Sequence, residues 1–186
     1  MAVLSLLLAA STLAASAEHP IDIGRSTIRI HVGKAGVFSA AGHEHWVTAP
    51  IADGQIEDGS PAGISFRVET RDMKVEEDKS LSAEKQAEVQ QTMQIQVLES
   101  ERYPEINFRS TSIKETANNT WEVRGELTLH GETRPVITEV HKQQNAYVGG
   151  CRLKQTEFGI RPVRVGGGMV KVKDELEIEF SIVPGQ

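Results

Sequence analysis

The chain has 186 residues, a formal net charge of −6 and one cysteine, Cys151. This length is enough for a single domain with a hydrophobic core of its own. One cysteine excludes an intramolecular disulfide, and an acidic chain without a basic tract is a poor candidate for binding nucleic acid or an anionic membrane. We expect Cys151 to be a small, half-buried strand residue, because a nucleophilic thiol needs an activating neighbour, which the sequence does not show.

Residues 1–17 form an uncharged, mostly apolar run that ends in Ala15-Ser16-Ala17. A short apolar stretch before such a small-x-small triplet is typical of a cleaved export signal, although this one contains no Lys or Arg. The run is also shorter than the ~20 apolar residues that span a bilayer. We therefore expect a signal peptide at 1–17, one domain at 18–186, no stable membrane span, and a periplasmic or secreted location.

Alternation of apolar and polar residues predicts β-strands along most of the remaining chain. In chain order, the expected extended segments cover residues 27–32, 37–47, 51–56, 64–68, 106–113, 121–124, a hairpin over 126–140, 147–160 with a break near Gly159, 170–173 and 176–182.

One segment in the middle of the chain has a different period. From Ser82 to about Leu98, Val89, Met93 and Val97 fall four residues apart in a stretch rich in Ala, Glu and Gln. This spacing predicts one amphipathic helix. Ser80 or Ser82 is the expected N-cap.

The hairpin at 126–140 has the clearest pattern, because alternation continues on both sides of His130-Gly131. Glycine adopts positive φ without strain and histidine tolerates it better than most residues, so this pair can replace the usual Asn-Gly turn. Pro135 cannot donate a ladder hydrogen bond and should lie at an edge, a bulge or early in its strand. We interpret His130 as a turn residue.

About eight strands with one helix inserted midway predict an all-β fold, a closed antiparallel eight-stranded barrel. The interior of such a barrel is just wide enough to hold one small apolar ligand, or to be filled by its own side chains. The sequence pattern cannot distinguish a ligand cavity from a filled core. The inward-facing residues expected to form it are Ile28, Ile30, Phe66, Val68, Met93, Phe108, Trp121, Val123, Leu127, Leu129, Phe158, Val172, Ile178 and Phe180.

His43 and His45 are the most distinctive polar pair. Residues i and i+2 of a strand point the same way, so both imidazoles can meet one metal ion, with Zn²⁺ or Cu²⁺ expected. Two ligands make a weak motif, since a metal site normally needs three or four. The alternative is an ordinary pair of histidines hydrogen-bonded to their neighbours. No motif for nucleophilic catalysis is visible, and we expect no enzyme activity.

Residues 101–112 (ERYPEINFRSTS) and 125–136 (GELTLHGETRPV), with a looser echo at 158–160 and 170–174, carry a family resemblance. The chain resembles the YceI-like family of secreted bacterial lipid- or polyisoprenoid-binding proteins. The resemblance implies a lipocalin-like barrel that holds a long isoprenoid or fatty chain.

Three functions follow as hypotheses. The first is a non-enzymatic carrier of the exported compartment, monomer or homodimer, that holds an isoprenoid, fatty acid or similar amphiphile as its small-molecule partner. The second is a secreted metal-binding protein that uses His43 and His45. The third is a structural or stress-related module with a filled core.

Overall fold

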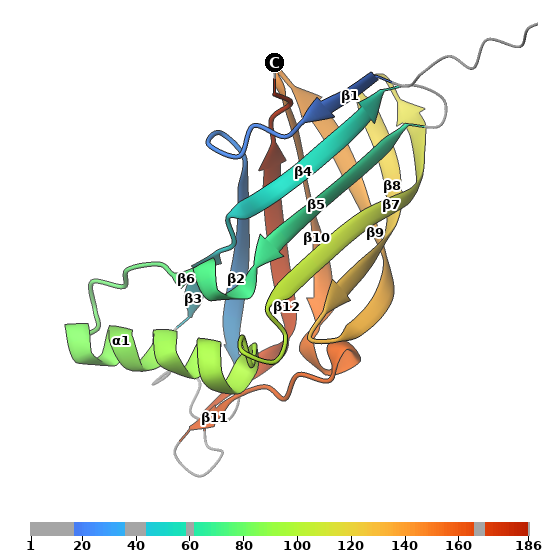
Figure 1. Ribbon diagram of the computed structural model, residues 1–186. Helices are drawn as coiled ribbons and strands as arrows, with labels where there is room; N and C mark the ends of the chain where they lie inside the picture. Colours follow the sequence, from blue (N-terminus) through green and yellow to red (C-terminus); the bar gives the residue numbers. More distant parts are fainter. Residues whose placement is uncertain (1–16, 36–43, 59–61, 166–169, 186) are drawn as a thin grey trace, which may run out of the picture.

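The structure is a computed structural model that describes residues 17–35, 44–58, 62–165 and 170–185. These residues form one antiparallel sheet that curls around itself (Figure 1), in the order β1-β4-β5-β7-β8-β9-β10-β12-β2-β3-β6, with β11 beside β12. The expected all-β antiparallel fold is confirmed, as a curled sheet of twelve strands rather than a closed barrel of eight. Eight of the twelve strands are long. They are β2 (Thr27–Ala35), β4 (Ile51–Asp58), β5 (Gly63–Glu69), β7 (Glu105–Ala117), β8 (Thr120–Leu129), β9 (Glu132–Gln143), β10 (Ala146–Lys154) and β12 (Val170–Ile182).

Four short strands complete the sheet, and three of them were not expected from the sequence. A strand of two to four residues shows too few alternations for the period-two pattern to reveal it. The extended segment expected at 37–47 is seen as β3, while residues 36–43 lie outside the described part of the chain. The short strands are β1 (Ala17–Pro20), β3 (His45–Thr48), β6 (Lys74–Val75) and β11 (Arg164–Val165).

At the upper end of the barrel, as drawn in Figure 1, the C-terminal segment closes the sheet against the start of the described chain. Ile21 forms an isolated bridge with Pro184, and the Asp22 amide donates a hydrogen bond to the Val183 carbonyl at 2.8 Å. The Ile21 amide donates to the Gly54 carbonyl on β4 at 2.9 Å. Hydrogen bonds therefore run from β12 through Ile21 to β4, which shortens the free edges of the sheet.

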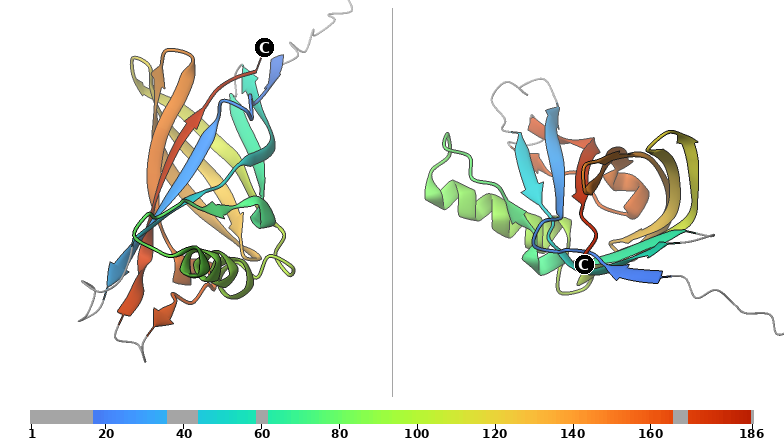
Figure 2. Two further views of the ribbon diagram at one scale, coloured as in Figure 1. Left: turned by 90° about the vertical axis from the view of Figure 1, so that its left-hand side faces the viewer. Right: turned by 90° about the horizontal axis from the view of Figure 1, so that it is seen from above.

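Helical segments gather at the lower end (Figures 1 and 2). The predicted helix is confirmed as α1 (Ala83–Thr92), which continues into the π-helical turn η3 (Met93–Val97). Ser82 is its cap, because the Ser82 hydroxyl accepts a hydrogen bond from the Lys85 amide. Two 3₁₀ turns, η2 (Thr70–Asp72) and η4 (Gln155–Phe158), lie beyond the lower ends of β5 and β10.

The helix α1 is held mainly by polar contacts, since none of its residues is fully buried. The side-chain amides of Gln86, Gln90 and Gln94 donate hydrogen bonds of 2.9 to 3.0 Å to backbone carbonyls of residues 70–76. Spacing of four residues puts the three amides on one helix face. A neighbouring part of the helix surface, including Val89, is thereby turned toward the barrel.

The hairpin predicted at His130-Gly131 is confirmed, with φ of 53° and 79° at these two residues between β8 and β9. Pro135 lies early in β9, ahead of the stretch at 139–143 where β10 pairs with that strand. The His130 side chain is only 9% exposed, and its Nε2 lies 3.1 Å from Oε1 of Glu99. His130 therefore also fastens the hairpin to the segment that follows η3.

An ion pair joins β2 to the segment after β6. The Arg29 guanidinium donates two hydrogen bonds of 2.7 Å to the Glu76 carboxylate, and the Thr48 hydroxyl donates a third at 3.0 Å. The hydrogen bonds from Arg29 are the main reason that the pKa of Glu76 lies below its usual value of 4.5, against the opposing effect of burial. Because Gln86 donates to the Glu76 carbonyl, the ion pair also helps to hold α1.

Acidification should remove the stability that the Arg29–Glu76 ion pair gives to the fold. A carboxylate whose pKa is lowered in the folded state stabilises the fold above its unfolded pKa, and this stability is lost as the pH falls through the folded pKa. Because the Glu76 side chain is 34% exposed, we expect the ion pair to contribute about 1 kcal/mol to the free energy of unfolding. The free energy of unfolding, measured in urea, should fall less between about pH 6 and about pH 3 in Glu76→Gln than in the wild type. The exposed Glu77→Gln is the matched control, and an equal loss in both variants would contradict the prediction.

Candidate functional site

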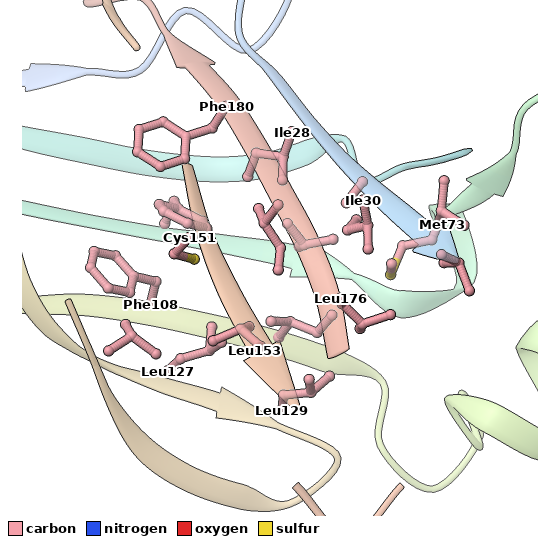
Figure 3. A pocket seen from close by; sticks show the side chains of 18 of the residues that line it. Ile28, Ile30, Met73, Phe108, Leu127, Leu129, Cys151, Leu153, Leu176 and Phe180 are labelled. Atoms are coloured by element: carbon pink, nitrogen blue, oxygen red, sulfur yellow. The ribbon is translucent and has the colours of Figure 1, made fainter. Parts of the chain in front are cut away.

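The curled sheet surrounds a cavity of about 890 Å³. Ligand sites in proteins span roughly 300–1,000 Å³, so this one is large enough for a whole small molecule. All eight long strands contribute side chains to its wall, and α1 and η3 contribute others. Figure 3 shows Phe108 and Phe180 toward one end of the cavity and Met73 and Leu176 toward the other.

The structure places almost every residue of the expected inward set in the wall. The role of these residues in binding stays a prediction, but their common position is a fact of the fold. The wall contains Ile28, Ile30, Phe66, Val68, Met93, Phe108, Trp121, Val123, Leu127, Leu129, Val172, Ile178 and Phe180.

Phe158 is the exception. Its side chain is 1% exposed and belongs to the buried core cluster, and it is not among the residues that line the cavity. The prediction treated Phe158 as part of a strand, whereas it lies in the 3₁₀ turn η4, where side chains do not alternate between two faces. The predicted break near Gly159 is real, since this residue has φ of 71°.

Several wall residues were missed by the sequence reasoning. Tyr147, Cys151 and Leu153 of β10 all face the cavity. They are separated by even numbers of residues, which puts their side chains on one face of the strand, and this pattern could have revealed them. Met73 follows the turn η2 and had no periodic pattern to mark it.

Cys151 is half-buried in this apolar wall, and burial raises the pKa of its thiol to about 11. The thiol is therefore almost entirely protonated at neutral pH, and a protonated thiol is a poor nucleophile. This agrees with the expectation of a half-buried strand residue.

The lower end of the cavity is lined by positively charged side chains. Lys34 and Lys171 come from the paired lower ends of β2 and β12, and Lys85 comes from α1. Lys85 Nζ also lies 2.6 Å from Oε2 of Glu88, which lines the same end. Among the described residues that line this end, three are therefore lysines and one is a glutamate.

The upper end of the cavity has the opposite sign. Glu57 and Asp58, at the end of β4, line it beside the start of β5. His19 Nε2 lies 3.0 Å from Oδ2 of Asp58. The cavity is therefore an apolar space with lysines at its lower end and carboxylates at its upper end.

The structure does not test the predicted metal pair. His45 lines the lower end of the cavity, and His43 lies outside the described residues. Within the ranges that the structure describes, no three His, Cys, Asp or Glu side chains come together in a way that could hold a metal ion. The use of His43 and His45 as zinc or copper ligands stays a prediction.

A curled antiparallel sheet around one large apolar cavity, with a helix beside one end, defines a lipocalin-like barrel. The chain belongs to the YceI-like family, since the family model for the YceI-like domain matches residues 20–183. The resemblance stated from the sequence is thereby confirmed.

Two relatives carry the comparison at the level of sequence. A UPF0312 protein of Vibrio cholerae serotype O1 is 30% identical over 92 residues, which are 44% of this chain and 47% of the relative. A UPF0312 protein of Pseudomonas syringae pv. tomato is 48% identical over 89 residues, 42% of this chain and 44% of the relative. Each match spans less than half the length of the relative.

Solved structures show the same fold. BcnA of Burkholderia cenocepacia superposes with a TM-score of 0.64 at 18% identity, over 88% of this chain and 98% of BcnA. A polyisoprenoid-binding domain of Saccharophagus degradans superposes with a TM-score of 0.58 at 8% identity, over 91% and 98% of the two chains. None of the helices in the described part of this chain has the length and apolar character needed to cross a bilayer.

Proposed function

We propose that this protein is a non-enzymatic carrier of the exported compartment that holds an amphiphile, with its apolar chain inside the barrel. The observation that carries the proposal is the cavity of about 890 Å³ with an apolar wall along the barrel. Membership in the YceI-like family and the fold shared with a polyisoprenoid-binding domain support it. An isoprenoid or a fatty acid fits this description.

Burial of the chain would supply the affinity. Each CH₂ removed from water contributes about 0.8 kcal/mol, and part of this gain is offset by the free-energy cost of association. The cavity wall has few polar groups to orient a ligand, so its position must be set at the ends. The proposal therefore assigns an anionic headgroup to the lower end, where Lys34, Lys85 and Lys171 lie.

The direct test is native mass spectrometry of the protein purified from its own host. We expect an adduct whose mass, after release and fragmentation, is that of a lipid with a long apolar chain. A protein that is consistently free of ligand, and that binds neither fatty acid nor isoprenoid when these are added, would contradict the proposal.

The headgroup assignment gives a prediction about two lysines. Lys34→Gln together with Lys171→Gln should weaken binding of palmitate about tenfold, because two charges near the carboxylate are lost. Binding of hexadecanol, which has the same chain and no charge, should change little. Both affinities can be measured by displacement of a fluorescent fatty acid. Lys142→Gln, at the upper end of β9, is the control, and an equal loss for both ligands would argue against the assignment.

The thiol of Cys151 offers a second measurement of occupancy. Because its pKa is about 11, against 9.0 for an ordinary thiol, iodoacetamide should alkylate it about a hundredfold more slowly than a free cysteine at the same pH. A ligand chain in the cavity should slow the reaction further, because Cys151 lines the wall. Alkylation at the rate of a free cysteine, with and without palmitate, would contradict this.

The exported location is part of the proposal and rests on residues 1–17. Cell fractionation followed by N-terminal sequencing should find a periplasmic or secreted protein that begins at Glu18. An uncleaved chain retained in the cytoplasm would contradict it.

The sequence also suggested a module with a filled core and a metal-binding protein. The cavity in the interior of the barrel argues against the filled-core module. The metal-binding hypothesis needs its own measurement, metal analysis of the wild type beside a His43→Ala/His45→Ala variant. Equal and negligible zinc and copper in both would rule it out.

A further inference from the structure

Three phenylalanine side chains line the cavity in its upper half: Phe66 on β5, Phe108 on β7 and Phe180 on β12. We refer to them as the phenylalanine belt. Phe66 and Phe108 are register partners, and their stacked rings have centroids 5.2 Å apart. All three side chains are only partly buried, so part of each ring faces the cavity. Figure 3 shows Phe108 and Phe180 directed into the same space.

Two of these rings lie over glycines of neighbouring strands. A Cβ atom added to Gly125 of β8 would lie 2.5 Å from Cε2 and Cζ of Phe108. One added to Gly149 of β10 would lie 2.6 Å from Cζ of Phe180. Real Cβ atoms do not come so close to other heavy atoms, so each ring edge occupies the space that a side chain would take at the glycine. The rings are therefore laid against the wall of the barrel.

Every other residue type at Gly125 or Gly149 would displace a ring. Gly125 alternates with Val123 and Leu127, whose side chains line the cavity, and Gly149 alternates in the same way with Tyr147 and Cys151. Both glycines therefore face inward. The direction open to a displaced ring is toward the cavity, since the backbone closes the other side.

We propose that Gly125 and Gly149 set the width of the cavity at the phenylalanine belt, and so limit how far an apolar chain enters it and how wide that chain can be. The inference rests on the proposed function, because the width matters only if a chain occupies the cavity. A chain whose headgroup is held at the lower end must pass the belt to reach the space beside Trp121. Raising a ring from the wall should stop the chain there, and removing a ring should favour wider, methyl-branched chains over straight ones.

The first test uses Gly125→Ala and a series of saturated carboxylates from octanoate to eicosanoate. In the wild type, each CH₂ that enters the cavity should strengthen binding about fourfold until the space is filled. In Gly125→Ala the increase should end at a shorter chain, because the Phe108 ring is pushed into the cavity. Eicosanoate should then bind about tenfold more weakly or worse, while octanoate binds as in the wild type.

A double variant separates the effect of the Phe108 ring on binding from the effect of strain in the sheet. The added Cβ of Gly125→Ala would also lie 2.7 Å from the backbone carbonyl oxygen of Arg109, so the substitution strains the strand pairing. Gly125→Ala/Phe108→Ala keeps this strain and removes the ring, and binding of eicosanoate should return. A loss that is equal at all chain lengths, or that persists in the double variant, would overturn the inference.

A third variant tests the role of the phenylalanine belt if Gly125→Ala does not fold. Phe180→Ala widens the belt without changing a glycine, and it should raise the affinity for methyl-branched phytanate relative to palmitate about tenfold. An unchanged ratio overturns the inference. A wild type that binds none of these carboxylates overturns the proposed function as well, whereas binding by the wild type with unchanged selectivity in the variants overturns the role of the belt alone.

Discussion

Phe158→Ala should lower the free energy of unfolding by about 3–5 kcal/mol, enough to unfold much of the protein. The side chain is 1% exposed and lies in the core cluster with Leu129 and Ile160, so its removal leaves a cavity that the surrounding residues cannot fill. Urea unfolding followed by circular dichroism measures the loss. Ligand affinity of the molecules that remain folded should be unchanged, because Phe158 does not line the ligand cavity.

Phe108→Ala is the matched control for that experiment. Phe108 already faces a cavity and is only partly buried, so its removal should cost less than about 3 kcal/mol. Its effect should appear in ligand selectivity. If the two alanine variants lose the same stability, or if Phe158→Ala changes ligand affinity, the separation of core from cavity wall is wrong.

Cys151→Trp should abolish binding of long chains, with a loss in affinity of at least about a hundredfold. Cys151 lies in the wall of the cavity beside Leu153, and Phe108 and Phe180 line the same cavity (Figure 3). An indole at this position projects into the space that a chain would occupy. Because the protein's own side chains do not fill that space, the substitution should cost less stability than the about 1–3 kcal/mol typical of overpacking a filled core.

The measurement is displacement of a fluorescent fatty acid, repeated by native mass spectrometry on protein from the host. Cys151→Ala is the control, since it removes the thiol without filling the space, and its affinity should stay close to that of the wild type. Retained binding in a folded Cys151→Trp variant would show that the ligand, if any, lies elsewhere.

Sequence periodicity predicted the main features of this fold. The period-two pattern identified the long strands, and a spacing of four identified α1, because side-chain direction along a strand or helix follows from local backbone geometry. The turn at His130-Gly131 was predictable for the same reason, since positive φ is a local requirement. Pattern failed where segments were short, as in β6, or where a helical turn replaced a strand, as at Phe158.

The inward face of the barrel was likewise visible in the sequence, but its use was not. Alternation places Phe108 and Leu127 on the enclosed side, yet a filled core and an open cavity have the same alternation. The difference depends on distances across the barrel between residues far apart in the chain. The close contacts of Phe108 with Gly125 and of Phe180 with Gly149 are examples, because each contact joins two different strands.

By itself, therefore, the sequence determined the class of fold, the family and most of the residues that face inward, all of which follow from local periodicity and short motifs. Only the tertiary structure decided that the interior is open, that lysines from β2, α1 and β12 meet at one end of it, and that Phe158 belongs to the core. The physical reason is that volume and charge inside a barrel are set by how the strands close around it. Closure here depends on contacts such as that of Ile21 with Pro184, which no local pattern encodes.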